Sequence, residues 1–116
     1  MPSNALPPAR RIRRRGEFQR VFDAGRRAHG RYLTIIAAPA EGELSRLGIV
    51  ASRKIGGAVE RNRAKRLIRQ VFRTENVPAR ASDLVVIAKH AAVTAVAGDV
   101  AIDYRTTLKR LGLSIS

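Results

Sequence analysis

The side chains best suited to chemistry are the cations of one uninterrupted stretch, Ala58 to Arg73. It contains no proline or glycine, so its composition predicts a helix. At about 100° per residue, its apolar side chains gather on one face and its polar side chains cover the rest of the surface. The apolar face consists of Ala64, Leu67, Ile68, Val71 and Phe72, and the polar surface of Arg61, Asn62, Arg63, Lys65, Arg66, Arg69 and Arg73.

This arrangement of cations opposes helix stability. Like charges stand four residues apart at Arg61, Lys65 and Arg69, and each such pair costs about 0.2–0.5 kcal/mol in an isolated helix. Glu60 is the only acid in the stretch, whereas solvated helix faces usually mix their signs. A bound polyanion that relieves the repulsion explains the pattern better than a merely solvated face.

The segment before this helix adds charge and backbone donors. Ser52, Arg53 and Lys54 are followed by two glycines, Gly56 and Gly57, directly before the predicted helix start. Backbone N–H groups at such a position can approach an anion closely. The spacing does not match that of a P-loop, so a nucleotide-hydrolysing site is not indicated.

An aromatic pair marks a second candidate site. Phe18 and Phe22 stand four residues apart in a helix predicted for residues 17–24, which Gly25 ends. Such a pair more often belongs to a core. Aromatic residues make up only 4% of the chain, however, and Arg20 lies between these two, so a stacking platform for unpaired bases stays open as an alternative.

The elements that position these residues alternate in type. β-branched and apolar runs predict strands, of which the last is buried on both faces, and a final helix carries an apolar stripe of Val100, Tyr104, Leu108 and Leu111. We expect strands over residues 32–38, 47–51 and 83–89, a short strand or irregular segment over 26–30, and the final helix over 98–111. The first two of these runs suggest an antiparallel hairpin. The order α-β-β-β-α-β-α predicts a two-layer α/β sandwich with a βαβ unit around the basic helix.

Length and charge limit the possible functions. The 116 residues allow one domain, which we expect over residues 12–116 after a disordered lead-in at 1–11. The basic run 10–15 is predicted to be too dense in charge to pack, and serves either as an electrostatic arm or as a solvated tail. A net charge of +14 indicates nucleic acid or an anionic membrane surface as the partner. The absence of cysteine fits a reducing, cytoplasmic environment.

The titratable residues form no catalytic pattern. The carboxylates are scattered, and His29 and His90 have no Ser, Cys or Asp in a triad-like arrangement. We therefore expect no catalytic residue and no metal ligand in this chain. It is predicted to bind rather than to catalyse.

The segment 58–69, with Arg61-Asn62-Arg63 followed by Lys65-Arg66-Leu67-Ile68-Arg69, resembles the signature of the bacterial ribonuclease P protein component. Residues 16–25, 47–56 and 83–89 resemble the first helix of that family, the strand and loop before its signature, and its last strand. The resemblance covers roughly residues 12–111. Arg53 stands where Lys is common in the family, and Gly57 where Asn is common.

The resemblance implies a function and a fold. The family is the small subunit of the ribonucleoprotein that removes the 5′ leader from precursor tRNA, and its RNA subunit performs the hydrolysis with bound Mg²⁺. The implied partners are therefore ribonuclease P RNA and the single-stranded leader, and neither a membrane nor DNA. The implied fold is an α-β sandwich, like the second domain of a small-subunit ribosomal protein, with a left-handed βαβ crossover where a right-handed one is the general rule.

The resemblance also assigns residues to two surfaces. The basic motif and its flanking loop would face the catalytic RNA and the nearby substrate, through Arg61, Asn62, Arg63, Lys65, Arg66, Arg69, Arg53 and Lys54. The aromatics would lie in a cleft between the first helix and the sheet that holds the leader, formed by Phe18, Phe22 and Tyr32 with Ser52, and with Lys54, Asn62 and Arg69 along its sides.

Other classes share part of this pattern. A ribosomal protein or a general RNA chaperone would have the same size and charge. A helix-turn-helix DNA-binding module is disfavoured because the basic helix follows a strand. A free-standing protein nuclease is disfavoured because no carboxylate cluster is evident to hold its metals.

Overall fold

A computed structural model of the chain describes residues 8–75 and 81–113. The helices and strands follow the predicted order, and each boundary lies within two residues of its predicted position. They are α1 (Arg15–Ala24), β1 (Arg26–His29), β2 (Leu33–Pro39), β3 (Arg46–Val50), α2 (Ala58–Thr74), β4 (Ser82–Ala88) and α3 (Ala97–Arg110), with short 3₁₀ helices η1 (Pro8–Arg10), η2 (Arg53–Ile55) and η3 (His90–Val93). The segment predicted as either strand or irregular structure is β1.

The sheet has the strand order β1-β2-β4-β3. β2 pairs antiparallel with β1 and β4, whereas β3 pairs parallel with β4. The predicted hairpin between β2 and β3 is therefore wrong, because β4 lies between them. The apolar run of β4 explains this position: Val85 and Val86 point to opposite faces and are both fully buried, as a central strand requires.

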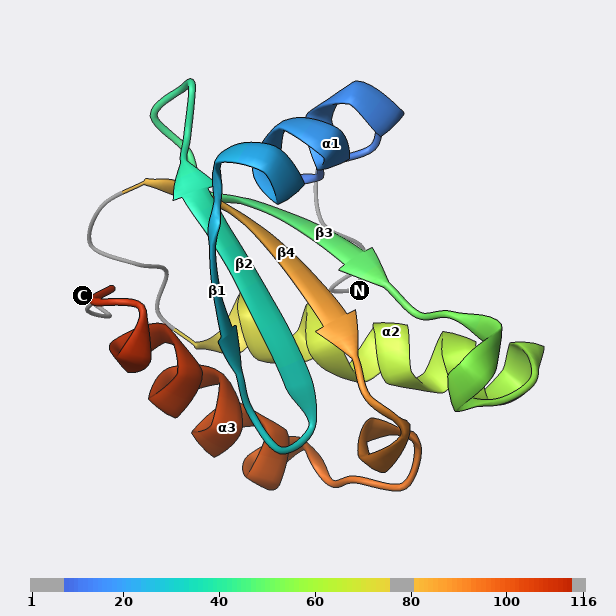
Figure 1. The fold of residues 1–116 in the computed structure, drawn as a ribbon. Helices are drawn as coiled ribbons and strands as arrows, with labels where there is room; N and C mark the ends of the chain where they lie inside the picture. The colour runs from blue at the N-terminus through green and yellow to red at the C-terminus, as the bar shows by residue number, and fades with distance from the viewer. Residues whose placement is uncertain (1–7, 76–80, 114–116) are drawn as a thin grey trace.

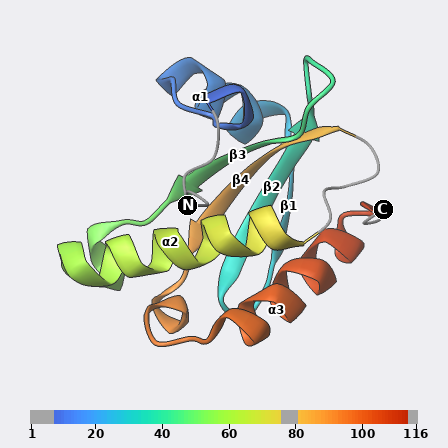
Figure 2. The ribbon, with the colours of Figure 1, turned by 180° about the vertical axis from the view of Figure 1, so that it is seen from behind.

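The connection from β3 through α2 to β4 is left-handed. Figure 2 views the sheet from the side of α2, and there β4 lies to the left of β3 when the strands are taken as pointing upward. The same relation follows from the opposite side in Figure 1. The crossover implied by the family resemblance is thus present in this chain.

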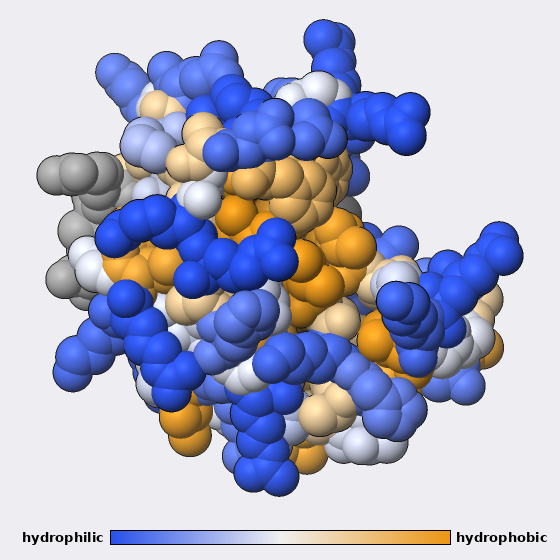
Figure 3. All heavy atoms as spheres, viewed as in Figure 1, coloured by the Kyte–Doolittle hydropathy of each residue, from blue (hydrophilic) through white to orange (hydrophobic). Residues whose placement is uncertain are grey.

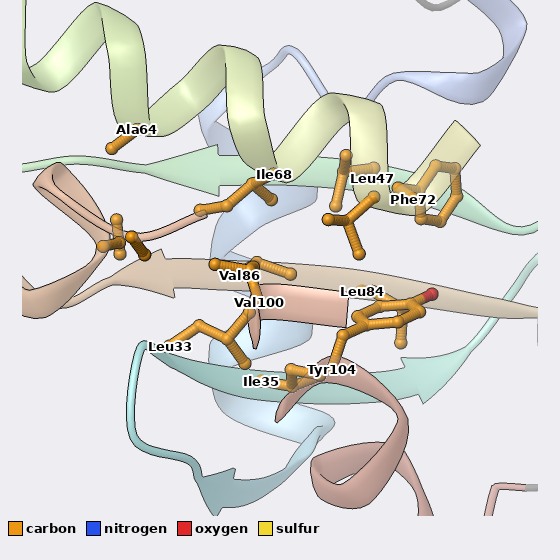
Figure 4. Close-up of a cluster of buried hydrophobic side chains, with 14 of the residues drawn as sticks. Leu33, Ile35, Leu47, Ala64, Ile68, Phe72, Leu84, Val86, Val100 and Tyr104 are labelled. Atoms are coloured by element: carbon orange, nitrogen blue, oxygen red, sulfur yellow. The ribbon is translucent and has the colours of Figure 1, made fainter. Parts of the chain in front are cut away.

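The two faces of the sheet are covered unequally. α2 and α3 lie side by side across one face, and α1 lies alone at one end of the other (Figures 1 and 2). The main core fills the space between the sheet and the helices α2 and α3, where Leu33 and Ile35 of β2 meet Tyr104 of α3 and Phe72 of α2 (Figure 4). The predicted apolar faces of both helices are therefore confirmed, with Leu67 only partly buried.

A smaller core lies under α1. It contains Ile12, Val21, Ile36, Ala38 and Val85. At its margin Phe18, Val50 and Ile87 are only partly buried. Figure 3 shows the result, an apolar surface on this face of the molecule next to α1 with hydrophilic side chains around it. We call this half-covered part of the sheet the open face.

The first half of the N-terminal basic run packs against the domain, contrary to the prediction that its charge is too dense to do so, whereas Arg13, Arg14 and Arg15 are exposed. Ile12 is buried, and its N–H donates to the carbonyl oxygen of Leu47 at 2.9 Å on the free edge of β3. The guanidinium of Arg10 lies 5.2 Å from the centre of the Phe72 ring. Apolar contact and cation–π attraction offset the charge here. Of the predicted lead-in, residues 1–7 lie outside the described residues.

No helix in the described part of the chain is long and apolar enough to cross a membrane.

Candidate RNA interface

The cations of helix α2 differ in solvent exposure around the helix. Ala64, Ile68, Val71 and Phe72 are buried. On the flank beside β3, Arg61, Lys65 and Arg69 follow one another at intervals of four residues, and each is half-buried. Asn62 and Arg66 are exposed on the side away from the sheet. The structure thus brings most of the predicted basic residues onto one continuous surface.

A pocket of about 140 Å³ joins this basic flank to the open face. Its lining includes Lys65 and Arg69 of α2, Gly48 of β3, Phe18 of α1 and Arg11. The Nε atom of Arg11 is buried without a hydrogen-bond partner among the described residues. Three cations and an aromatic ring around one small cavity suit a phosphate and its attached nucleoside.

Sequence reasoning did not include Arg11 among the site residues. Arg11 belongs to the basic run 10–15, but charge alone does not predict which cation of that run contacts the domain. The β-bridge between Arg11 and Leu47, on the edge of β3, places Arg11 there. It depends on a contact between residues far apart in the sequence.

Arg63 differs from its neighbours in the basic motif. Its Nη1 donates to the carbonyl oxygen of Val93, and its Nη2 to that of Ala95 at 3.1 Å. These carbonyls belong to η3 and to the segment that follows it. The side chain of Arg63 therefore ties this segment to α2, and the residue is exposed on the helix that the family resemblance assigns to RNA.

The loop before α2 carries its cations outward. Ser52, Arg53 and Lys54 are all exposed. The ring Nδ1 of His90 donates to the carbonyl oxygen of Ile55 at 3.0 Å, which fixes η2 to the segment after β4. Gly56 has φ 152°, a backbone conformation that favours glycine, and a Cβ there would lie 2.8 Å from Glu60 Cβ.

The predicted aromatic cluster is only partly present. Phe18 and Phe22 lie on α1, the first half-buried beside the open face and the second 36% exposed. Tyr32 lies elsewhere, because its main-chain N–H donates to Asp103 Oδ2 of α3 at 2.8 Å and its side chain packs against the main core. The structure does not bring Tyr32 to the two phenylalanines. The guanidinium of Arg31 lies 5.4 Å from the centre of the Tyr32 ring.

An ion-pair network attaches α1 to the sheet. The carboxylate of Asp83, on β4, accepts hydrogen bonds from Arg46 of β3 and from Arg20 of α1. Arg46 also donates to Glu17 of α1 at 2.6 Å. The backbone N–H of Arg14 and the guanidinium of Arg46 lower the pKa of Glu17 to about 2. Sequence reasoning missed this network because nothing local indicates that these residues meet.

The described residues include no group of three or more His, Cys, Asp or Glu side chains that could hold a metal ion. The site as a whole combines cations, an aromatic pair and an apolar surface. Together these suit an extended polyanion with unpaired bases.

Comparison with known proteins identifies the family. The family model for ribonuclease P matches residues 6–112. The chain belongs to the ribonuclease P protein family. It is 41% identical over 103 residues to the ribonuclease P protein component of Desulfovibrio desulfuricans, and the match covers 85% of this chain and 75% of that protein. It is 44% identical over 84 residues to the same component of Dehalococcoides mccartyi, covering 72% of this chain and 69% of that one.

Solved structures of ribonuclease P proteins share the fold. A mutant of the Staphylococcus aureus protein, described as defective in mRNA degradation activity, superposes with a TM-score of 0.80 at 31% identity and covers 90% of each chain. The Thermotoga maritima protein gives a TM-score of 0.75 at 31% identity, covering 86% of this chain and 96% of that one. The sandwich is thus the fold of ribonuclease P proteins.

Proposed function

We propose that this chain is the protein subunit of the ribonucleoprotein that removes the 5′ leader from precursor tRNA. In this proposal the RNA subunit carries out hydrolysis with Mg²⁺ ions that it mainly holds itself. The protein binds both that RNA and the single-stranded leader. Membership of the ribonuclease P protein family supports the subunit role, and the geometry supports the two binding tasks.

One observation carries the proposal. The basic flank of α2 and the apolar open face meet at the pocket lined by Lys65, Arg69 and Phe18. A single surface therefore passes from a cationic zone to an aromatic and apolar zone without interruption. Such a surface can hold a structured RNA at one end and an unpaired strand at the other.

The catalytic RNA would contact the outward cations. Arg66 and Asn62 are exposed on α2, and Arg53 and Lys54 are exposed on the loop before it. Arg61 belongs to the same helix flank as the pocket cations. Neutralising phosphates with these side chains releases counterions, so binding is expected to weaken steeply as salt rises.

The leader would cross the open face beside α1. Phe22 and Phe18 offer rings on which bases can stack, and each stack contributes about 1–3 kcal/mol with little sequence preference. The cations of the pocket would hold a leader phosphate. Ser52 and Lys54 follow β3 at the edge of this face and extend the same path. Tyr32 has no part in this path.

The protein would also reduce the need for Mg²⁺. Its net charge of +14 lowers the repulsion between two RNA molecules that must approach each other. Fewer bound cations are then required for the complex to form. The protein supplies charge to the assembly, and the proposal assigns it no metal ligand.

The testing experiment measures leader cleavage from a precursor tRNA by a bacterial ribonuclease P RNA at low millimolar Mg²⁺, with and without this chain. We expect strong stimulation only when protein and RNA are both present, and no cleavage by the protein alone. Absence of stimulation by a folded sample, together with tight binding to ribosomal RNA, would instead support a ribosomal or chaperone role. Cleavage by the protein alone would contradict the proposed division of labour.

A further inference from the structure

We propose that Asp83 is a positioning residue for leader binding, because its buried carboxylate sets the place of α1 over the sheet and hence the places of Phe18 and Phe22. The inference rests on the proposed function, in which these two rings contact the leader. Asp83 is 0% exposed, so it cannot touch RNA itself. Any effect it has on the leader must pass through the residues that it holds, Arg20 of α1 and Arg46 of β3.

Both oxygens of the Asp83 carboxylate are engaged. Oδ1 accepts from Arg46 Nε at 3.0 Å, and Oδ2 accepts from Arg46 Nη2 at 2.8 Å and from Arg20 Nη2. This bidentate contact with Asp83 fixes the orientation of the Arg46 guanidinium. Arg46 then reaches α1 through Glu17 Oε2 at 2.6 Å.

Helix α1 is therefore held at two points that converge on one carboxylate. Arg20 binds Asp83 directly, and Glu17 binds it through Arg46. Arg20 also donates to the carbonyl oxygen of Pro39 at 3.3 Å and pairs with Glu41 at 2.9 Å, which ties the helix to the end of β2. Because Glu17 and Arg20 are three residues apart, the contacts restrain rotation of the helix about its axis.

Apolar packing alone restrains this helix weakly. Val21 is its only fully buried residue, whereas Phe18 is half-buried and Phe22 is 36% exposed. Nondirectional apolar burial restrains rotation of the helix about its axis less than charged hydrogen bonds at fixed angles do. Glu17 directly precedes Phe18, and Arg20 lies two residues before Phe22, so the restraint acts where the rings are attached.

The test compares the holoenzyme affinity for precursor tRNA with that for mature tRNA. Asp83→Asn keeps the size of the side chain and removes the charge that holds both arginines. We expect the advantage of the leader-bearing precursor to fall by at least about fivefold, the lower end of one base stack. Affinity for mature tRNA and for the RNA subunit should stay unchanged. In the free protein, the NMR cross-peaks between the Phe18 ring and the Gly48 Hα protons should weaken.

Leu108→Ala is the matched control for general destabilisation. Leu108 is fully buried in the main core, on the opposite face of the sheet from α1. A merely structural role for Asp83 predicts that both variants melt earlier and that neither changes the ratio of precursor to mature affinity. A changed ratio in Asp83→Asn alone supports positioning.

Glu17→Gln keeps the test decisive if Asp83→Asn fails to fold. The amide oxygen can still accept the N–H of Arg14, but its charge-assisted bond with Arg46 is lost. A smaller loss of the precursor advantage is expected. If Phe22→Ala abolishes that advantage while both network variants keep it, the inference is overturned and the leader assignment stands. If Phe22→Ala leaves the advantage intact, the leader assignment itself fails, and the inference with it.

Discussion

The ring of Phe18 lies directly against the backbone of Gly48, where a Cβ atom would come within 2.7 Å of Phe18 Cε1. Ile12 Cβ would lie 3.1 Å from the same point. Glycine is required here by close approach and not by an unusual backbone angle, since Gly48 is not among the positive-φ residues. The position of the ring on the open face therefore depends on a missing side chain in the neighbouring strand.

Gly48→Ala should displace the Phe18 ring and destabilise the fold by about 1–3 kcal/mol, the usual cost of overpacking. Thermal and denaturant unfolding measure this change. Gly16→Ala is the matched control, because nothing lies within 4 Å of the added methyl group and the residue is helical. That control should leave stability unchanged or raise it by up to about 1 kcal/mol. Equal effects at the two positions would contradict the close contact.

Phe22→Ala should weaken holoenzyme binding of precursor tRNA but not of mature tRNA, because only the precursor has a leader to stack on the ring. The loss should be about 1–3 kcal/mol in binding free energy for one stacked base. Ile102→Ala is a suitable comparison, since Ile102 is also an exposed apolar side chain, 56% exposed, but lies on α3. Equal losses for precursor and mature tRNA would rule out the leader contact.

Arg66→Ala and Arg63→Ala should separate RNA binding from internal support. Arg66 is exposed and makes no hydrogen bond or ion pair with another described residue, so its loss should weaken assembly with the RNA subunit and lower the salt slope by about one. The melting temperature of the Arg66→Ala protein should equal that of the wild type. Arg63→Ala should instead lower the melting temperature, because one carbonyl of η3 and one of the segment after it lose their donor. Unchanged assembly for Arg66→Ala at physiological salt would contradict its role.

Glu17 predicts a pH dependence of stability. The pKa of its carboxyl is lowered from 4.5 to about 2 in the folded protein, by the backbone N–H of Arg14 first and by Arg46 second. The folded state thus favours the charged form, and the stabilisation is fully present above pH 4.5 and is lost as the pH falls toward 2. The stability difference between the wild type and Glu17→Gln should be at its full value above pH 4.5 and disappear as the pH falls below about 2. A pH-independent difference would contradict the lowered pKa.

Local patterns in the sequence were sufficient to predict the elements of this fold and the basic surface of α2. Helix α2 has an uninterrupted apolar stripe, and β4 has a continuous apolar run, so the sequence of each element predicts which of its residues are buried. Strand order was different: the hairpin prediction failed because nothing within β2 or β3 says that a later strand will lie between them. Handedness came from the family resemblance, which periodicity could not supply.

The position of a site residue was predictable from the sequence where it depends only on solvent exposure. It was not predictable where it depends on contacts with residues far away in the chain. Arg66 stays outward as any cation on a polar helix face would. The side chain of Arg63 donates to two carbonyls some 30 residues away. The backbone N–H of Tyr32 donates to a carboxylate 71 residues away, and its side chain packs against the main core. Asp83 is one acid among several in the sequence, yet it joins α1 to two strands. These outcomes depend on contacts between distant segments that no local pattern records.

The central place of β4 has a consequence for how the chain folds during synthesis. Residues 8–75 contain β1, β2 and β3, yet β3 has no strand beside it until Ser82–Ala88 emerges from the ribosome. Pairing that links distant segments is slow to form because the chain must first close large loops. The first two thirds of the polypeptide therefore cannot complete the sheet, and cooperative folding waits for the last third to be translated.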